Sequence, residues 1–196
     1  MKIFWENLFR KNPVFVLFLG FVPAVAVASS AEAGLALGLI TGVILVLTTI
    51  LNYFLSLLLP KNARTVGQLV VLIILTVSAH RILLTLNPQV VGTLNIFLPL
   101  LVANSLVIYS LQENDLPFGA VILDSIGKSL GFLLALVLIG IVREFFGYGT
   151  FFGTKLFTSD LPPLALASTV PGGMIIVGLL LALVNMVRGQ GGELHD

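Results

Sequence analysis

The feature that most constrains this chain is a series of long apolar stretches separated by short polar connections. About 20 apolar residues cross the hydrocarbon core of a bilayer as a helix, so 196 residues give room for about six spans and no separate soluble domain. Only 10% of the residues are charged and 58% are apolar, which is far from a soluble composition. We therefore expect an all-α integral membrane protein with one membrane domain over residues 1–196, and we expect no nucleic-acid binding.

Turn residues and charges predict where the spans end. The first span follows Met1–Asn12, an aromatic and basic segment that suits a helix lying on the membrane surface. Turns are predicted at Pro60–Arg64 and Asn87-Pro88, and Arg143-Glu144 is predicted to open an irregular, aromatic connection that continues to Pro163. The six predicted spans cover residues 13–29, 34–59, 65–84, 91–111, 120–142 and 164–187.

Helix-breaking residues lie near the middle of two spans. Gly20 and Pro23 interrupt the first span, and Pro99, Asn104 and Ser105 lie within the fourth. Proline removes a backbone donor and clashes with the preceding turn, so each break leaves polar backbone groups that protein or water must satisfy. We expect broken helices in spans one and four, and we interpret the first as a retained span rather than a cleaved secretory signal because it is interrupted.

The sequence around the first break is echoed around the second. An acidic residue followed by spaced glycines occurs in Glu32–Gly38 after the first break and in Asp124–Gly131 after the second. Three spans in each half would insert the second half with the opposite orientation, giving a 3+3 inverted repeat with halves at about residues 13–84 and 91–187. The alternative is chance similarity among leucine-rich spans.

Residue spacing predicts two further contacts on helices. Gly34, Gly38 and Gly42 share one face and permit close approach of a neighbouring helix. Asp124 and Lys128 are four residues apart and can form an ion pair within one face. We favour a structural pair over a role in ion translocation, and both residues remain candidates for an ion path.

The positions of the cations predict the orientation of the spans. Cytoplasmic loops of membrane proteins carry an excess of Lys and Arg, which places both termini in the cytoplasm of a multi-pass inner-membrane protein. His80 beside Arg81 is interpreted as an interfacial pair rather than a ligand. The predicted cytoplasmic cations are Lys2, Arg10, Lys11, Lys61, Arg64 and Arg188, and the predicted external ones are Arg81, Arg143 and Lys155.

Four segments together resemble a known family. They are WENLFRKNPVFVLFLGFVP, IFLPLLVANSLVIY, Asp124–Gly131 and REFFGYGTFFG. The chain is similar over nearly its whole length to the six-span membrane subunits of Rnf-type and Nqr-type ion-translocating oxidoreductase complexes, of the Rnf E and Nqr D type. The resemblance implies an inverted pairing with a sister six-span subunit of the Rnf A or Nqr E type, and contacts with other subunits of the complex.

The resemblance also implies a [2Fe-2S] cluster, for which each of the two paired proteins supplies one cysteine per broken helix. The family patterns LGxCP and TNCAVLG match Leu19–Pro23 and Ala103–Val107, where Val22 and Ser105 stand at the cysteine positions. The chain contains no cysteine, so we expect no cofactor on this chain alone and no metal ligands within it.

Two functions follow as hypotheses. The first is a membrane subunit of an Rnf-like or Nqr-like electron-transport complex that translocates ions without iron–sulfur ligands of its own and is not catalytic alone. The alternative is a secondary transporter or channel-like protein for a small solute or cation, whose broken helices line the binding site. The candidate residues are Gly20, Pro23, Pro99, Asn104, Ser105, Asp124 and Lys128.

Overall fold

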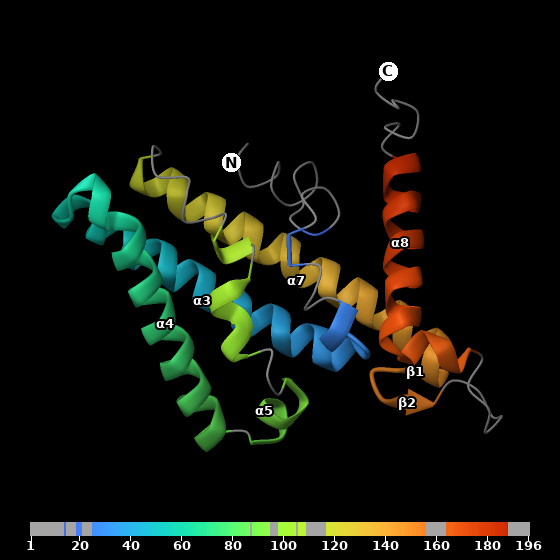
Figure 1. Ribbon diagram of the computed structural model, residues 1–196. Coiled ribbons are helices and arrows are strands. Elements are labelled where there is room, and N and C mark those ends of the chain that lie inside the picture. The colour runs from blue at the N-terminus through green and yellow to red at the C-terminus, as the bar shows by residue number, and fades with distance from the viewer. Residues whose placement is uncertain are drawn as a thin grey trace.

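The computed structural model describes residues 14, 19–20, 25–86, 88–94, 98–104, 106–108, 117–155 and 164–187 (Figure 1). Within them, three helices are long and apolar enough to cross a membrane: α3, the Ala63–Leu86 part of α4, and α7. These helices, with the shorter apolar α8, agree with an all-α membrane protein. The six-span count and the inverted repeat stay predictions. The helices are α3 (Ala31–Leu58), α4 (Lys61–Leu86), α5 (Pro88–Leu94), the 3-10 helix η3 (Pro99–Ala103), α7 (Phe118–Tyr148), the 3-10 helix η4 (Ala165–Ser168) and α8 (Val170–Val187).

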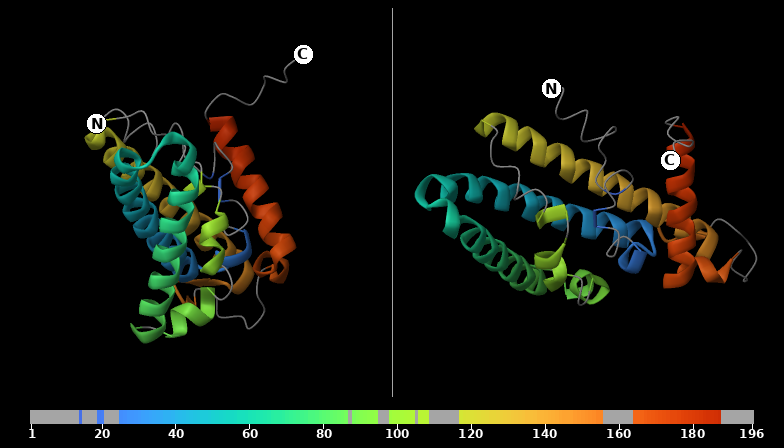
Figure 2. Two further views of the ribbon diagram at one scale, coloured as in Figure 1. Left: turned by 60° about the vertical axis from the view of Figure 1, so that its left-hand side comes forward. Right: turned by 45° about the horizontal axis from the view of Figure 1, so that its top comes forward.

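Helices α3 and α7 lie side by side and form the centre of the structure (Figures 1 and 2). Their backbones come so close at Gly34 that a methyl group there would lie only 2.6 Å from the carbonyl oxygen of Leu136. The close approach therefore depends on glycine at this position. Further along α3, Gly42 faces Ser129, whose hydroxyl donates to the Gly42 carbonyl at 3.2 Å. This confirms the predicted glycine face and identifies α7 as the helix that packs against it.

Helix α4 returns beside α3 as the second arm of a helical hairpin (Figure 1). It begins at Lys61, directly after Pro60, so the predicted turn over residues 60–64 is mostly helix. Proline is well tolerated where a helix starts, and Pro60 therefore ends the turn instead of prolonging it. Between residues 63 and 86 only Gln68, Leu72 and Thr76 are buried, so α4 presents most of its surface outward.

The fourth predicted span is broken, as expected. Helix α5 ends at Leu94, η3 begins at Pro99, and Asn104 has an extended backbone with ψ of 119° before a helical turn at residues 106–108. The first of these helices begins at Pro88 rather than at Val91. A proline and a polar cap thus divide an apolar stretch that is long enough for one continuous helix.

The structure differs from the prediction most at the end of the fifth span. Helix α7 continues six residues past Val142 to Tyr148, so the prediction that Arg143 and Glu144 open an irregular connection is wrong. The helix ends where Gly149 adopts the left-handed conformation, with φ of 66°. A two-stranded antiparallel hairpin follows, formed by β1 (Thr150–Phe151) and β2 (Thr154–Lys155).

The sixth predicted span is also divided. The 3-10 helix η4 ends at Ser168, Thr169 has an extended backbone, and α8 then begins at Val170. Proline at the second position of α8 fits the start of a helix, where no backbone donor is needed. Pro171 therefore lies at a boundary between two helices.

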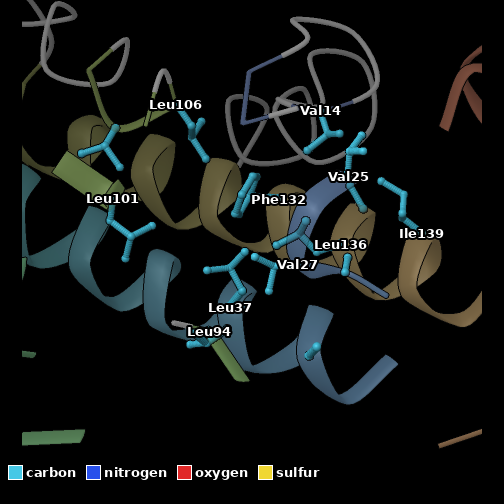
Figure 3. Close-up of a cluster of buried hydrophobic side chains, with 14 of the residues drawn as sticks. Val14, Val25, Val27, Leu37, Leu94, Leu101, Leu106, Phe132, Leu136 and Ile139 are labelled. Atoms are coloured by element: carbon cyan, nitrogen blue, oxygen red, sulfur yellow. The ribbon is translucent and has the colours of Figure 1, made fainter. Parts of the chain in front are cut away.

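A single apolar cluster joins the central helices to the segments beside the breaks (Figure 3). Phe132 on α7 is fully buried within it, together with Leu101 of η3 and Leu106 of the turn after Asn104. Val25 and Val27, which follow the first break, belong to the same cluster. The core therefore holds the neighbourhoods of both breaks against α3 and α7.

Candidate functional site

The break in span four is closed by the side chain of Asn104. This residue ends η3 and is 5% exposed, and its Oδ1 accepts a hydrogen bond from the backbone N–H of Leu106 at 3.0 Å. Its own carbonyl accepts from the N–H of Ile108 at 3.1 Å, so the residue acts as the cap of the next helical turn. The sequence interpretation that the Asn104 amide meets backbone groups freed at the break is confirmed.

The break in span one approaches α7 at Phe132. Gly20 has a φ of 71°, a conformation that glycine adopts without strain, and its Cα faces the Phe132 ring so closely that a methyl group would clash. Pro99 lies at the start of η3 and is exposed. Val22, Pro23 and Ser105 lie outside the described residues.

The residues around the breaks do not fit a [2Fe-2S] cluster. Such a cluster needs about four strong ligands, which are ordinarily thiolates, and the chain has no cysteine. Among the described residues near the two breaks, Phe132, Leu106 and Val25 are apolar and buried. Among the described residues there is also no group of three or more His, Asp or Glu side chains that could hold a metal ion.

The predicted ion pair on α7 is present. Nζ of Lys128 lies 2.7 Å from Oδ2 of Asp124, and the two side chains are 3% and 12% exposed. A buried pair at this distance compensates part of the cost of removing each charge from water. Ser125 and Ser129, on the same part of α7, are buried as well, so the helix carries a polar patch next to α3.

Arg143 forms a centre that the sequence interpretation missed. It is fully buried, and its guanidinium donates hydrogen bonds to five backbone carbonyl groups. The acceptors are the carbonyls of Val25 (2.5 Å), Ala28 (3.1 Å), Ala167 (3.2 Å), Ser168 (3.1 Å) and Thr169 (3.1 Å). Arg143 is therefore a buried residue of α7 and not a loop cation, because the segments before α3 and α8 supply acceptors for its charge. The side of the membrane on which it lies stays a prediction.

Glu144 fixes the other side of the same region. Its Oε2 accepts from the backbone N–H of Ala31 at 2.9 Å, at the start of α3, where a negative charge is favourable. Its Oε1 accepts from the N–H of Gly153 at 2.7 Å and from the hydroxyl of Thr150 at 2.9 Å. One carboxylate thus joins α7, the first turn of α3 and the β1–β2 hairpin.

Glycines are the sequence signal that could have marked this region. A methyl group on Gly173 would lie 2.8 Å from Cζ of Arg143, and one on Gly147 would lie 2.9 Å from the backbone nitrogen of Ser168. Gly173 therefore makes room for the guanidinium, and Gly147 makes room for η4. The chemistry of this centre is structural, since every acceptor of Arg143 is a backbone carbonyl.

Comparison with known proteins gives a consistent result over almost the whole chain. A family model described as "Rnf-Nqr subunit, membrane protein" matches residues 1–181. A relative from Acetobacterium woodii, named as the E subunit of a Na(+)-translocating ferredoxin:NAD(+) oxidoreductase complex, is 33% identical over 94% of this chain and 95% of its own length. A relative from Clostridium ljungdahlii, named as the E subunit of a proton-translocating ferredoxin:NAD(+) oxidoreductase complex, is 31% identical over 94% of this chain and 88% of its own length.

Proposed function

Because the chain belongs to the Rnf-Nqr family of membrane subunits, we propose that it is the E-type subunit of an ion-translocating oxidoreductase complex in which it holds no iron–sulfur ligand. The observation that carries the proposal is the family match over residues 1–181 together with the near full-length relatives. Two of those relatives are named for different ions, Na+ and H+, so membership of the family leaves the ion open.

In this role the subunit is a packing and ion-gating scaffold. Electrons that cross the complex pass through carriers on other subunits, since this chain offers no thiolate. The proposed ion-path elements are the buried Asp124–Lys128 pair and the capped break at Asn104. Ionisable and polar groups inside a membrane span are rare because their burial is costly, and they often mark the path of an ion.

The arrangement in the membrane is part of the proposal. We infer six spans in a 3+3 inverted repeat, with broken first and fourth spans and both termini in the cytoplasm. Two observations support this: α3 and α7 follow the two breaks in the chain, and they pack on each other through small residues. The proposed neighbour is a sister six-span subunit of the Rnf A or Nqr E type in the inner membrane.

The proteins that accompany the chain test the proposal. Purification of the tagged chain from its native membrane in mild detergent, followed by identification of the co-purifying chains, is expected to recover flavin-binding, ferredoxin-like and sister six-span subunits. The isolated chain is expected to be colourless and free of iron. A homogeneous preparation of this chain without partners would favour a transporter, and a reduced [2Fe-2S] resonance assigned to the isolated chain would contradict the absence of ligands.

A further inference from the structure

We propose that the exposed face of α3 binds one phospholipid molecule with an anionic headgroup, with its two acyl chains in two neighbouring grooves and its phosphate at Arg64. Helix α3 lies between α4 on one side and α7 on the other, so a groove can form along each of its flanks (Figure 2). Such a site belongs to this chain alone and does not depend on the proposed role in a complex.

Two grooves flank a ridge on α3. The groove between α3 and α7 has a volume of about 360 Å3, and the groove between α3 and α4 has a volume of about 470 Å3. Leu39, Val43 and Leu47 line both grooves, are spaced by four residues and are 45–57% exposed, so they form the ridge between them. Two grooves side by side, separated by one row of side chains, match a ligand with two chains.

The walls of both grooves suit hydrocarbon. None of the described residues that line them is charged, and their polar side chains are Ser129 in the first groove and Ser78 in the second. The Ser129 hydroxyl already donates to the carbonyls of Gly42 at 3.2 Å and Ser125 at 2.7 Å. An acyl chain in either groove therefore leaves no charged group without water.

The ridge suits acyl chains better than a helix of another subunit. Helices pack against each other in membranes through small residues that let their backbones approach closely. Helix α3 uses such a face at Gly34 to contact α7, whereas Leu39, Val43 and Leu47 project from the surface. Flexible chains can lie on both sides of a projecting row, and a rigid helix is held away from both grooves by it.

Arg64 supplies the charge that a phosphate complements. Its Nε donates to the carbonyl of Leu59 at 3.2 Å, which fixes the guanidinium at the start of α4. Among the described residues Arg64 has no carboxylate partner, and the first turn of α4 contains no acidic residue. Guanidinium groups bind phosphate through paired hydrogen bonds, so the terminal nitrogens of Arg64 suit an anionic headgroup.

Arg64 also lies at the right place relative to the grooves. Ile82, which lines the groove between α3 and α4, follows it by 18 residues, or about five helical turns, so both side chains point in the same direction. Ser78 of the same groove lies ~21 Å further along α4 than Arg64, and one leaflet with its headgroups is about 20–22 Å thick. A lipid whose phosphate contacts Arg64 therefore has its chain ends in the groove.

Aromatic side chains mark the level between Arg64 and the grooves. The ring of Phe118 at the start of α7 lies 5.7 Å from that of Phe54 and 4.9 Å from that of Tyr53, both on α3. Phe54 follows Val43 by 11 residues, about three turns, and therefore lies on the ridge side of α3. Aromatic rings gather where hydrocarbon meets headgroups, which agrees with a phosphate at Arg64 and chains beyond the rings.

Native mass spectrometry of the delipidated full chain in detergent tests the headgroup. The first dioleoylphosphatidylglycerol is expected to bind ~5-fold more tightly than dioleoylphosphatidylcholine, which has the same chains, and Arg64→Gln is expected to remove this preference. Arg81→Gln, an exposed change on a different side of α4, is the matched control and should keep it. No preference in the wild type, or the same loss in both variants, would overturn the proposal.

Two adjacent substitutions on α4 test the chains. Ser78→Phe fills the groove between α3 and α4 and is expected to weaken phosphatidylglycerol binding on the order of 10-fold, as if roughly two methylene groups were displaced. Val77→Phe adds a ring at a position that is 54% exposed and turned by about 100° from Ser78, and it should leave binding unchanged. Equal binding by the two variants would contradict the placement of a chain in this groove.

The other possible occupant of the ridge is a helix of another subunit. Because the chain has no cysteine, Val43→Cys can carry a single photoreactive group on the ridge in native membranes. Adducts with lipid are expected, and an adduct with another protein chain would overturn the proposal. Co-purification of partner subunits decides the proposed function separately, since either outcome at the ridge is compatible with an intact complex.

Discussion

Two pairs of charged residues lie on α7, and they are stabilised in opposite ways. Near the start of the helix, Asp124 and Lys128 neutralise each other at 2.7 Å within one helix face. Near its end, Arg143 and Glu144 are adjacent in sequence, and each is met by backbone groups of other segments. The first pair is a property of the helix itself, whereas the second joins the helix to α3, η4 and the hairpin.

The difference determines which pair holds the fold together. The Asp124–Lys128 pair can form as soon as α7 is helical, because both partners are on one turn. Arg143 instead binds carbonyls of Val25 and Thr169, which lie 118 and 26 residues away in the chain. We therefore expect changes at Arg143 to affect the global fold and changes at Asp124 or Lys128 to remain more local.

The largest expected effect is at Arg143. Arg143→Leu leaves five backbone carbonyls without their donor, three of them buried, and we expect a loss of about 3–5 kcal/mol in the free energy of unfolding, enough to reduce the yield of folded protein sharply. Thermal unfolding in detergent measures this. Arg81→Leu on the exposed surface of α4 is the control and is expected to change stability by less than about 0.5 kcal/mol. Equal effects of the two substitutions would show that the five bonds do not hold these segments.

The second prediction concerns the pair at the other end of α7. A double-mutant cycle with Asp124→Asn and Lys128→Met is expected to give a coupling energy of about 2 kcal/mol, because either single change removes the opposite charge that lies 2.7 Å from the remaining side chain. The double variant should be more stable than the sum of the single effects implies. Additive single effects would mean that the two charges are satisfied independently, as they are at Arg143 and Glu144.

The third prediction concerns Glu144, whose partners are all backbone or hydroxyl donors. Glu144→Gln places an NH2 group against one set of these donors, and we expect a loss of about 1–2 kcal/mol and faster hydrogen exchange at the amide of Ala31. Glu32→Gln, an exposed change in the first turn of α3, is the matched control and should leave exchange at Ala31 nearly unaltered. Unchanged exchange in Glu144→Gln would remove the capping role.

The comparison also shows which features the sequence could predict. The glycine face of α3, the Asp124–Lys128 pair and the break at Asn104 are patterns of spacing or residue type within one segment, and the structure contains all three. The role of Arg143 is not predictable in this way, because its partners are main-chain carbonyls and any residue can supply one. A charged residue after a long apolar run, such as Arg143, instead predicts the end of a membrane span.

The buried polar residues of α3 could not be predicted from the sequence, for a different reason. Thr41, Thr48 and Asn52 are separated by apolar residues, and threonine is ordinary in a membrane helix, where its hydroxyl can bond to the preceding turn. Thr49 does so, donating to the carbonyl of Leu45 at 2.7 Å. The structure distinguishes Thr48 from Thr49, since the hydroxyl of Thr48 is buried without a partner among the described residues.

The smallest expected effect is at Asn104, where the contact is again local. Asn104→Leu removes the acceptor of the Leu106 N–H, and we expect a loss of about 1 kcal/mol, because the change leaves one backbone N–H without its acceptor and breaks no contact between distant segments. Asn104→Ser keeps an oxygen that can cap the turn and is expected to retain most of the stability. Thermal midpoints of the two variants, measured beside the wild type, give the answer. A loss as large as that of Arg143→Leu would mean that Asn104 also joins distant segments, and an identical midpoint for all three proteins would mean that the break is held by the apolar cluster around Leu101 and Leu106 alone.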